Sequence, residues 1–546
     1  MKKRILLLLS MLVVTVLMVA ACGGGGTTAD PTPDAGAGTT PATETPAPTP
    51  TPGTQELPSG TTQDSLTILS GALPVSLVPW GSNDSASAEV NKQIYSHLFV
   101  LDYETFEVVP EKSLALEWSQ PDASTTNIRI RDNVLFHNGD LMTAHDVAFS
   151  LMEAASSPHA AAFLGMISDV AVHDDFNLTV YTEMPFVPII RHLAHPAAGV
   201  VHAGIFQEIG LDAFNDNPVG TGPFAFENLV LGDHVELSGN LNYWGHAPVI
   251  STLVWRVVPE ASVRLLEVIA GNADVALAIL PVEVAMAEAS PDVALHRRMN
   301  LGVNYIGFNA TQPHINNPLV RQAINYAIDT QEIVDLVFMG LGAPAHGPLA
   351  DMIWGFAELE PFTPNMDRAR ELLIEAGYNP TPGEPGGFST TIWWNIPNAQ
   401  REQQAEIVQH DLAMLNIDVE IISMEWAAYL EGTEQGLHDM FILGWTGITG
   451  DPDYALFPTF HSSGIGPSNR THWSDPELDR LLEAGRSELD PVVRMEIYRE
   501  AQQIIRDNAP WIFVNQSETV IATSPNLQGF VINPAGHHAY APVWFD

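Results

Sequence analysis

The sequence predicts a mixed α/β fold. Short runs of aliphatic and β-branched residues, such as 66–69, alternate with segments that begin at helix-capping residues and carry apolar side chains at helical spacing. Of the 546 residues, 46% are hydrophobic and 16% are charged, so most of the chain has the composition of folded domains. At ~150 residues per domain, this length gives a prior of about three or four domains.

Helix-start signals recur along the chain. Thr143 and Asp146 have the spacing of a capping box, and Asn317 lies just before Pro318, which favours a first helical turn. A capping-box pattern at Ser474 and an Asp-Pro pair at Asp490 have the same meaning. We therefore expect helices that begin at or just after residues 143, 317, 329, 474 and 490.

The charge balance and the cysteine count exclude several classes of function. There are 22 Lys and Arg residues against 65 Asp and Glu residues, which gives a formal net charge of −43. Such an acidic chain is disfavoured as a nucleic-acid-binding protein. A single cysteine allows neither an internal disulfide nor a Cys-based zinc site.

Histidines are the remaining candidates for a metal site. His192, His195 and His202 lie close together in the sequence, and the first two could share a helix face. Among 19 histidines such a group arises easily by chance, so we interpret them as ordinary loop and core residues, and His537 and His538 likewise. The sequence predicts no metal and no cofactor.

The N-terminus predicts export and anchoring. Residues 1–21 have a basic start and an apolar run of about 15 residues, which is short for a spanning helix. The string VAAC at 19–22 resembles a bacterial lipobox, in which Cys22 becomes lipidated; a simple secreted protein with a leftover thiol is the weaker alternative. Residues 22–65 then form a Pro/Thr/Gly-rich tether, whose glycosylation stays open.

The sequence does not indicate an enzyme. No nucleophile elbow, zinc-protease motif, P-loop or dinucleotide fingerprint is present. Acidic pairs are too frequent in this chain to identify the two carboxylates of a glycoside hydrolase. We keep an anchored extracellular glycan hydrolase as the alternative from another class of function.

Several motifs occur in an order that is typical of one family. They are RIRDNVLFHNG at 129–139, TAHDVAFS at 143–150, NPVGTGPF at 217–224, NYWG at 242–245, YIGFN at 305–309, VRQAI at 320–324, YAID at 326–329, GWTG at 444–447 and DPD at 451–453. Together they resemble family 5 of the bacterial extracellular solute-binding proteins, which serve ABC importers of peptides and nickel. The resemblance covers essentially all of residues 66–546.

The resemblance implies a two-lobed clamp like the periplasmic binding proteins of type II, in the large variant with three subdomains. Lobe I would combine 66–105, 222–309 and 515–546, with an inserted subdomain at 106–221, and lobe II would be 310–514. The protein would act as a monomer at the cell surface or in the periplasm, lipid-anchored to the outer face of the membrane. It would deliver its ligand to the permease and ATPase subunits of an importer.

The resemblance also implies where a ligand binds. Gly444, Trp445 and Thr446 match the ligand strand, and Ile448 stands where peptide binders carry the Asp that pairs with the peptide's α-amino group. Asp451 or Asp453 could substitute for that Asp, and either could equally be a turn residue. A peptide is the first choice of ligand, and a neutral oligosaccharide is the alternative.

Arg401 lies near the position at which dipeptide binders hold the C-terminal carboxylate, and a solvated position at a helix start is the alternative. Trp393 and Trp394 would face opposite sides of a strand, so at most one of them lines a given wall of the cleft. Trp80 has a core or hinge role as its alternative. The candidate ligand-binding residues are Trp80, Trp393, Trp394, Arg401, Gly444, Trp445, Thr446, Ile448, Asp451 and Asp453.

Overall fold

The computed structural model describes residues 63–82, 84–102 and 104–546. The predicted signal at 1–21, Cys22 and nearly all of the tether lie outside the described residues. The described chain is a mixed α/β structure, which confirms the predicted fold class. Within the described ranges, no helix combines the length and the apolar character needed to cross a bilayer.

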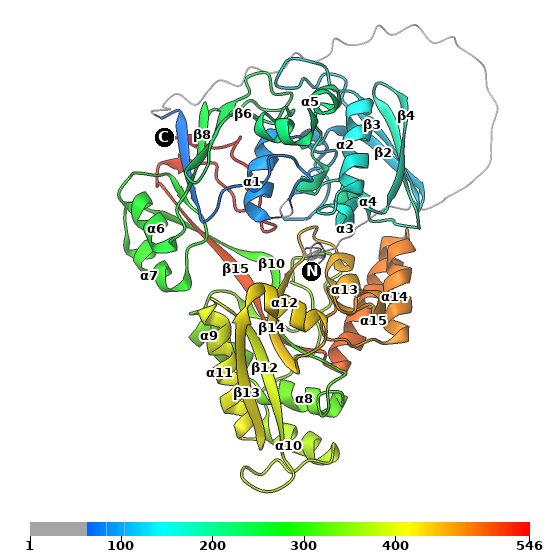
Figure 1. The fold of residues 1–546 in the computed structure, drawn as a ribbon, viewed down its shortest axis with the longest axis vertical. Helices are drawn as coiled ribbons and strands as arrows, with labels where there is room; N and C mark the ends of the chain where they lie inside the picture. The colour runs from blue at the N-terminus through cyan, green and yellow to red at the C-terminus, as the bar shows by residue number, and fades with distance from the viewer. Residues whose placement is uncertain (1–62, 83, 103) are drawn as a thin grey trace, which may run out of the picture.

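One long sheet runs through the whole molecule. Its strand order is β13-β12-β14-β10-β15-β9-β1-β8-β7-β6, and β11 (Ala343–Pro344) pairs with β15 outside this path. The two longest strands, β10 (Ala294–Phe308) and β15 (Trp511–Thr523), are antiparallel and pair along most of their length. Figure 1 shows that these two strands pass from the upper part of the molecule into the lower part. They are therefore the continuous connection between the two parts.

We call the lower part in Figure 1 lobe II. Its strands are β12 (Phe388–Ile396), β13 (Ile417–Glu425) and β14 (Met440–Thr446), and β12 is parallel to both of the others. The parallel strands are buried by helices, as parallel sheets require. These helices are α8 (Pro318–Ala327), α9 (Thr330–Val337), α10 (Met366–Glu375), α11 (Ala399–Ala413), α12 (Trp426–Glu434), α13 (Pro452–Phe460), α14 (Pro476–Ser487) and α15 (Pro491–Asn508).

We call the upper part lobe I. It contains β1 (Ser65–Ser70), β6 (Phe224–Val230), β7 (His234–Gly239), β8 (Thr252–Val257) and β9 (Val275–Ala276), with helices α1 (Ser85–Ile94), α6 (Ala261–Ile269) and α7 (Pro281–Ala289). The chain after β15 returns to this lobe, where β16 (Leu527–Gln528) pairs with β17 (Trp544–Phe545).

A second, four-stranded antiparallel sheet lies within the range 106–221. Its order is β2-β3-β5-β4, formed by β2 (Ala115–Asp122), β3 (Thr125–Ile130), β4 (Ile167–Asp174) and β5 (Asn177–Thr182). Around it lie α2 (Ala144–Ser156), α3 (Ala161–Leu164), α4 (Ile189–His192) and α5 (Ala203–Asp216). Its hydrophobic residues belong to the same core as those of β1 and β8, so this sheet packs on lobe I.

The predicted helix starts agree with the structure at all but one position. Thr143 with Asp146 forms the capping box of α2, and Asn317, Asp329 and Asp490 accept hydrogen bonds from the first turns of α8, α9 and α15. The prediction at Ser474 was wrong by one residue. The carboxylate of Asp475 caps α14 instead, because it accepts hydrogen bonds from the backbone N–H groups of Glu477 and Leu478 at 2.9 and 3.1 Å.

Candidate functional site

A small cavity lies where the end of β14 meets lobe I. Lobe I contributes residues from α1, from the loop at 100–106 and from the segment 191–196. Lobe II contributes Ile448 and Thr449, and the C-terminal segment contributes Asn533, Ala535 and His537. Both lobes therefore line one cavity, as expected where a clamp holds its ligand.

The two lobes are in direct contact around this cavity. Phe106 of lobe I is buried in a hydrophobic cluster of lobe II, and Tyr454 of lobe II is buried in the cluster of lobe I. Arg191 of α4 donates hydrogen bonds to the carbonyl oxygens of Thr449 and Gly450, at 3.3 and 3.1 Å. The structure thus shows the lobes closed on each other.

Basic side chains dominate the polar lining of this cavity. Lys92, in the last turn of α1, lies 3.4 Å from the carbonyl oxygen of Ala194, and burial lowers its pKa to about 8. His195 accepts a hydrogen bond at Nδ1 from the N–H of Ala197 at 3.1 Å, and burial lowers its pKa to about 3. Both ring nitrogens of His537 are buried without a hydrogen-bond partner, and burial lowers its pKa as well.

The predicted ligand strand leads into the cavity. Gly444, Trp445 and Thr446 are the last residues of β14 and pair with Asn304, Val303 and Gly302 of β10. The indole N–H of Trp445 donates to the carbonyl oxygen of Tyr454 at 3.1 Å, and its ring packs against the clusters of both lobes. Thr446 is exposed. Ile448 lines the cavity directly.

Asp451 and Asp453 are held by arginines rather than presented to the cavity. The carboxylate of Asp451 accepts two hydrogen bonds from Arg494, both at 2.8 Å, and both side chains are fully buried. Asp451 also caps α13, as its interpretation as a turn residue suggested. Asp453 pairs with Arg486 at 3.0 Å, although burial raises the pKa of Asp453 to about 6. Neither carboxylate is therefore part of the site that we propose below.

Arg401 lies on α11, on the lobe II side. It donates a hydrogen bond to the side-chain oxygen of Asn395, and its guanidinium lies 5.8 Å from the ring centre of Trp426. No carboxylate pairs with Arg401 among the described residues, and burial lowers its pKa. A partly buried guanidinium without an acidic partner can accept a carboxylate from a ligand.

Three tryptophans differ in their surroundings. Trp394 is only 5% exposed and belongs to the core of lobe II, whereas Trp393 packs against the other cluster of that lobe, so the prediction that they face opposite sides of β12 is confirmed. Trp80 is 4% exposed and packs on Phe206, with ring centres 5.7 Å apart. Trp80 and Trp394 therefore have core positions.

The histidine trio does not come together as a ligand set. His192 is buried against Phe186, and His202 contacts Asp140 at 3.0 Å and caps α5. In the part of the chain that the structure describes, no three His, Cys, Asp or Glu side chains are placed to hold a metal ion. The sequence singled out neither Lys92 nor Arg191, because residues so far apart in the chain share no motif.

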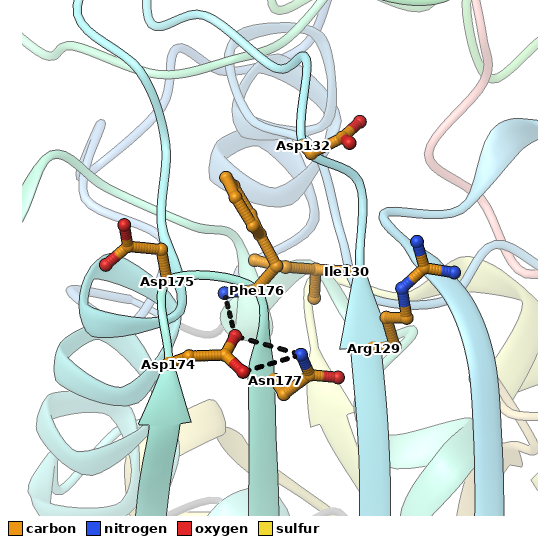
Figure 2. Close-up of a pocket in the computed structure, with 7 residues that line it drawn as sticks. All are labelled: Arg129, Ile130, Asp132, Asp174, Asp175, Phe176 and Asn177. Carbon is orange, nitrogen blue, oxygen red and sulfur yellow. Dashed lines mark hydrogen bonds between the residues drawn. The ribbon is translucent and has the colours of Figure 1, made fainter.

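A larger, more open hollow lies elsewhere, at one end of the four-stranded sheet. Figure 2 shows its lining, with Asp174 between β4 and β5. The carboxylate of Asp174 accepts hydrogen bonds from the backbone N–H of Phe176 and from the side-chain amide of Asn177, all at 2.9 Å. These contacts form a tight turn, and the hollow receives no residue from lobe II. We therefore place the candidate site between the lobes.

Known proteins with this architecture are binding proteins. The glutathione-binding protein GsiB of Pectobacterium atrosepticum is 30% identical over 476 residues, which cover 85% of this chain and 91% of that protein. The structure of HbpA2 from Haemophilus parasuis has a TM-score of 0.80 at 28% identity and covers 88% of this chain and 100% of the other. The periplasmic binding protein DppA from Helicobacter pylori, solved with the peptide STSA, has a TM-score of 0.74 at 26% identity and covers 89% and 98%.

A family model gives the most direct assignment. The model described as "Bacterial extracellular solute-binding proteins, family 5 Middle" matches residues 109–467, which include the four-stranded sheet, most of the long crossing strand β10 and its neighbours, and the ligand strand β14. This range is well over half of the chain, and the structural likeness extends to both lobes. The chain therefore belongs to family 5 of the bacterial extracellular solute-binding proteins.

Proposed function

We propose that this protein is the lipid-anchored, solute-capturing component of an ABC importer, and that it binds a peptide or a similar oligomeric solute between its lobes. The observation that carries the proposal is the cavity lined from both lobes, with Arg191 bridging to the backbone of lobe II. A ligand seated there holds the lobes together, and the closed form presents a surface to the permease. The division into lobe I, inserted subdomain and lobe II at the predicted residue boundaries is part of this proposal.

A peptide is supported by the relatives and by the edges of the site. DppA from Helicobacter pylori was solved with a peptide, and glutathione, named in the relative GsiB, is itself a tripeptide. In this chain Arg401 offers a guanidinium that no carboxylate neutralises among the described residues. We assign Arg401 to a ligand carboxylate, with Trp393 and Trp445 as apolar walls and Gly444, Thr446 and Ile448 as the strand along which the ligand lies.

The function is tested by a binding screen. We expect members of a set of di- to pentapeptides to bind reversibly and to raise the melting temperature, without product formation; at 100 times Kd a ligand adds about 2.7 kcal/mol of stability. Cello- and xylo-oligosaccharides form a second arm of the same screen. Binding by sugars alone would replace the peptide assignment, and turnover of any probe would contradict a pure capture role.

Arg401→Met should weaken binding of the best peptide by 10- to 100-fold, because a buried charge-assisted hydrogen bond is worth about 1.5–3 kcal/mol. Isothermal titration measures the change. Arg499→Met is the matched control, since Arg499 is exposed on α15 and contacts only Glu496 among the described residues. Equal affinities for the two variants would remove Arg401 from the site.

The lipid anchor is tested at Cys22. In a bacterial host, Cys22→Ser should release the protein from the membrane fraction into the surrounding fluid, because a thioether-linked lipid can form only at the cysteine. Labelling with a radioactive fatty acid should mark the wild type and not the variant. Membrane retention of the variant would show that residues 1–21 stay attached as an uncleaved anchor.

A further inference from the structure

The interlobe cavity has an unusual charge for this protein. The whole chain carries a formal net charge of −43, yet no Asp or Glu lines the cavity, whereas Lys92, Arg191, His195 and His537 do. Lys92 is one of only two lysines after the first three residues; the other is Lys112. A basic cavity within so acidic a chain points to the charge of what it receives.

Two of these side chains still have binding capacity. The ammonium group of Lys92 has a long 3.4 Å contact to one carbonyl oxygen, and no described acidic side chain neutralises it. The ring nitrogens of His537 are buried without a hydrogen-bond partner, which costs free energy unless a ligand supplies one. The backbone of His537 is held at a φ of 58°, which is uncommon for a non-glycine residue and marks a position fixed by its surroundings.

The lobe II wall of the cavity repels a cationic group rather than attracting one. Ile448 lies there, at the position where the family resemblance places the amine-binding Asp of peptide binders, and it offers no charge. Asp451 and Asp453, the nearby acids in the sequence, are paired with Arg494 and Arg486. An α-amino group in this cavity would meet Lys92 and find no described carboxylate to compensate it.

We propose that this cavity receives an anionic end of the solute, a carboxylate, and that the protein prefers oligomeric solutes with an acidic end here over peptides with a free α-amino group. The inference rests on the proposed solute-capture function and specifies its ligand class. Lys92 supplies the opposite charge, and His537 donates one N–H to a carboxylate oxygen. The cavity volume of about 50 Å³ suits a group of a few atoms and not a whole oligomer, so the rest of the solute lies outside it.

Three probes that differ only at one end test this preference. Tri-alanine has a cationic amino end, N-acetyl-tri-alanine a neutral one, and N-succinyl-tri-alanine an anionic one. We expect the succinylated probe to bind at least roughly tenfold more tightly than tri-alanine, with the acetylated probe between them, since one charge-assisted contact separates the ends. Isothermal titration on the exported full chain gives the three dissociation constants.

Variants then assign the preference to the cavity. Lys92→Met should bring the succinylated and acetylated probes within about twofold of each other, and Lys92→Arg should retain the preference. Lys112→Met is the matched control, because Lys112 is exposed and outside the cavity, and it should behave as the wild type. Tighter binding of tri-alanine, or an unchanged preference in Lys92→Met, would overturn the inference.

A fourth probe separates this inference from the peptide assignment. If none of the three peptides binds, glutarate is compared with pentane-1,5-diamine at 10 mM in a thermal-shift measurement. A rise in melting temperature with glutarate alone, lost in Lys92→Met, would keep the anionic cavity and reject peptides as the solute. No shift with glutarate would overturn the anionic cavity too.

Discussion

Asp451→Ala should lower the free energy of unfolding by about 3–5 kcal/mol, the largest effect that we expect from a single substitution. The change removes both hydrogen bonds to Arg494 and leaves the guanidinium buried without a counter-charge, which is far more costly than the loss of an exposed pair. It also removes the cap of α13. Urea denaturation followed by circular dichroism measures the effect.

Two further variants separate the ion pair from the cap. Glu496→Ala on α15 breaks an exposed pair with Arg499 and should change stability by less than about 0.5 kcal/mol. Arg494→Met with Asp451→Asn, combined, leaves no buried charge and keeps a capping side chain, so it should recover much of the loss. A loss below about 1 kcal/mol in Asp451→Ala would show that Arg494 finds other partners.

The sequence could predict the role of Asp451 but not its partner. Asp before Pro at a helix start is a local signal, and it correctly identified a residue that caps its own turn. Arg494 lies on another helix, and the pairing depends on how α13, α14 and α15 pack together. Local signals contain no information about such contacts, so the alternative of a ligand-binding carboxylate stayed open until the structure closed it.

The same limit applies to the candidate site. The motif at 444–447 placed β14 correctly beside the cavity, because a short strand motif is local. Lys92 and His537 come from opposite ends of the folded chain and meet only because the segment after β15 returns to lobe I. Their importance follows from burial, unpaired ring nitrogens and the lack of acidic neighbours, none of which a single sequence displays.

Gly220 and Gly222 show what a turn motif can predict. The sequence motif indicated a tight turn or a close backbone approach, and the structure confirms the close approach. A Cβ at Gly220 would lie 2.1 Å from the carbonyl oxygen of Ile94, and a Cβ at Gly222 would lie 2.3 Å from that of Gln93. The motif did not indicate that the neighbour is the end of α1, the helix that carries Lys92.

Gly222→Ala should therefore act on both stability and ligand binding. The new methyl group meets backbone atoms, which cannot rotate away, so we expect a loss of about 3 kcal/mol in unfolding free energy. Gly222 also donates to the carbonyl oxygen of Ile94 at 2.8 Å and accepts from His137 and Asn240 at 3.1 and 3.0 Å. A shift here moves the last turn of α1.

Because Lys92 lies in that turn, Gly222→Ala should weaken binding of the succinylated probe more than binding of the acetylated one. Gly71→Ala is the control, since its methyl group would meet only Arg264 at an ordinary 3.5 Å. Thermal unfolding and titration of both variants with the same probes measure the two effects. Equal losses for the two probes would mean that the turn supports the fold without positioning Lys92, and an unchanged stability would mean that the end of α1 yields more easily than packed backbone does.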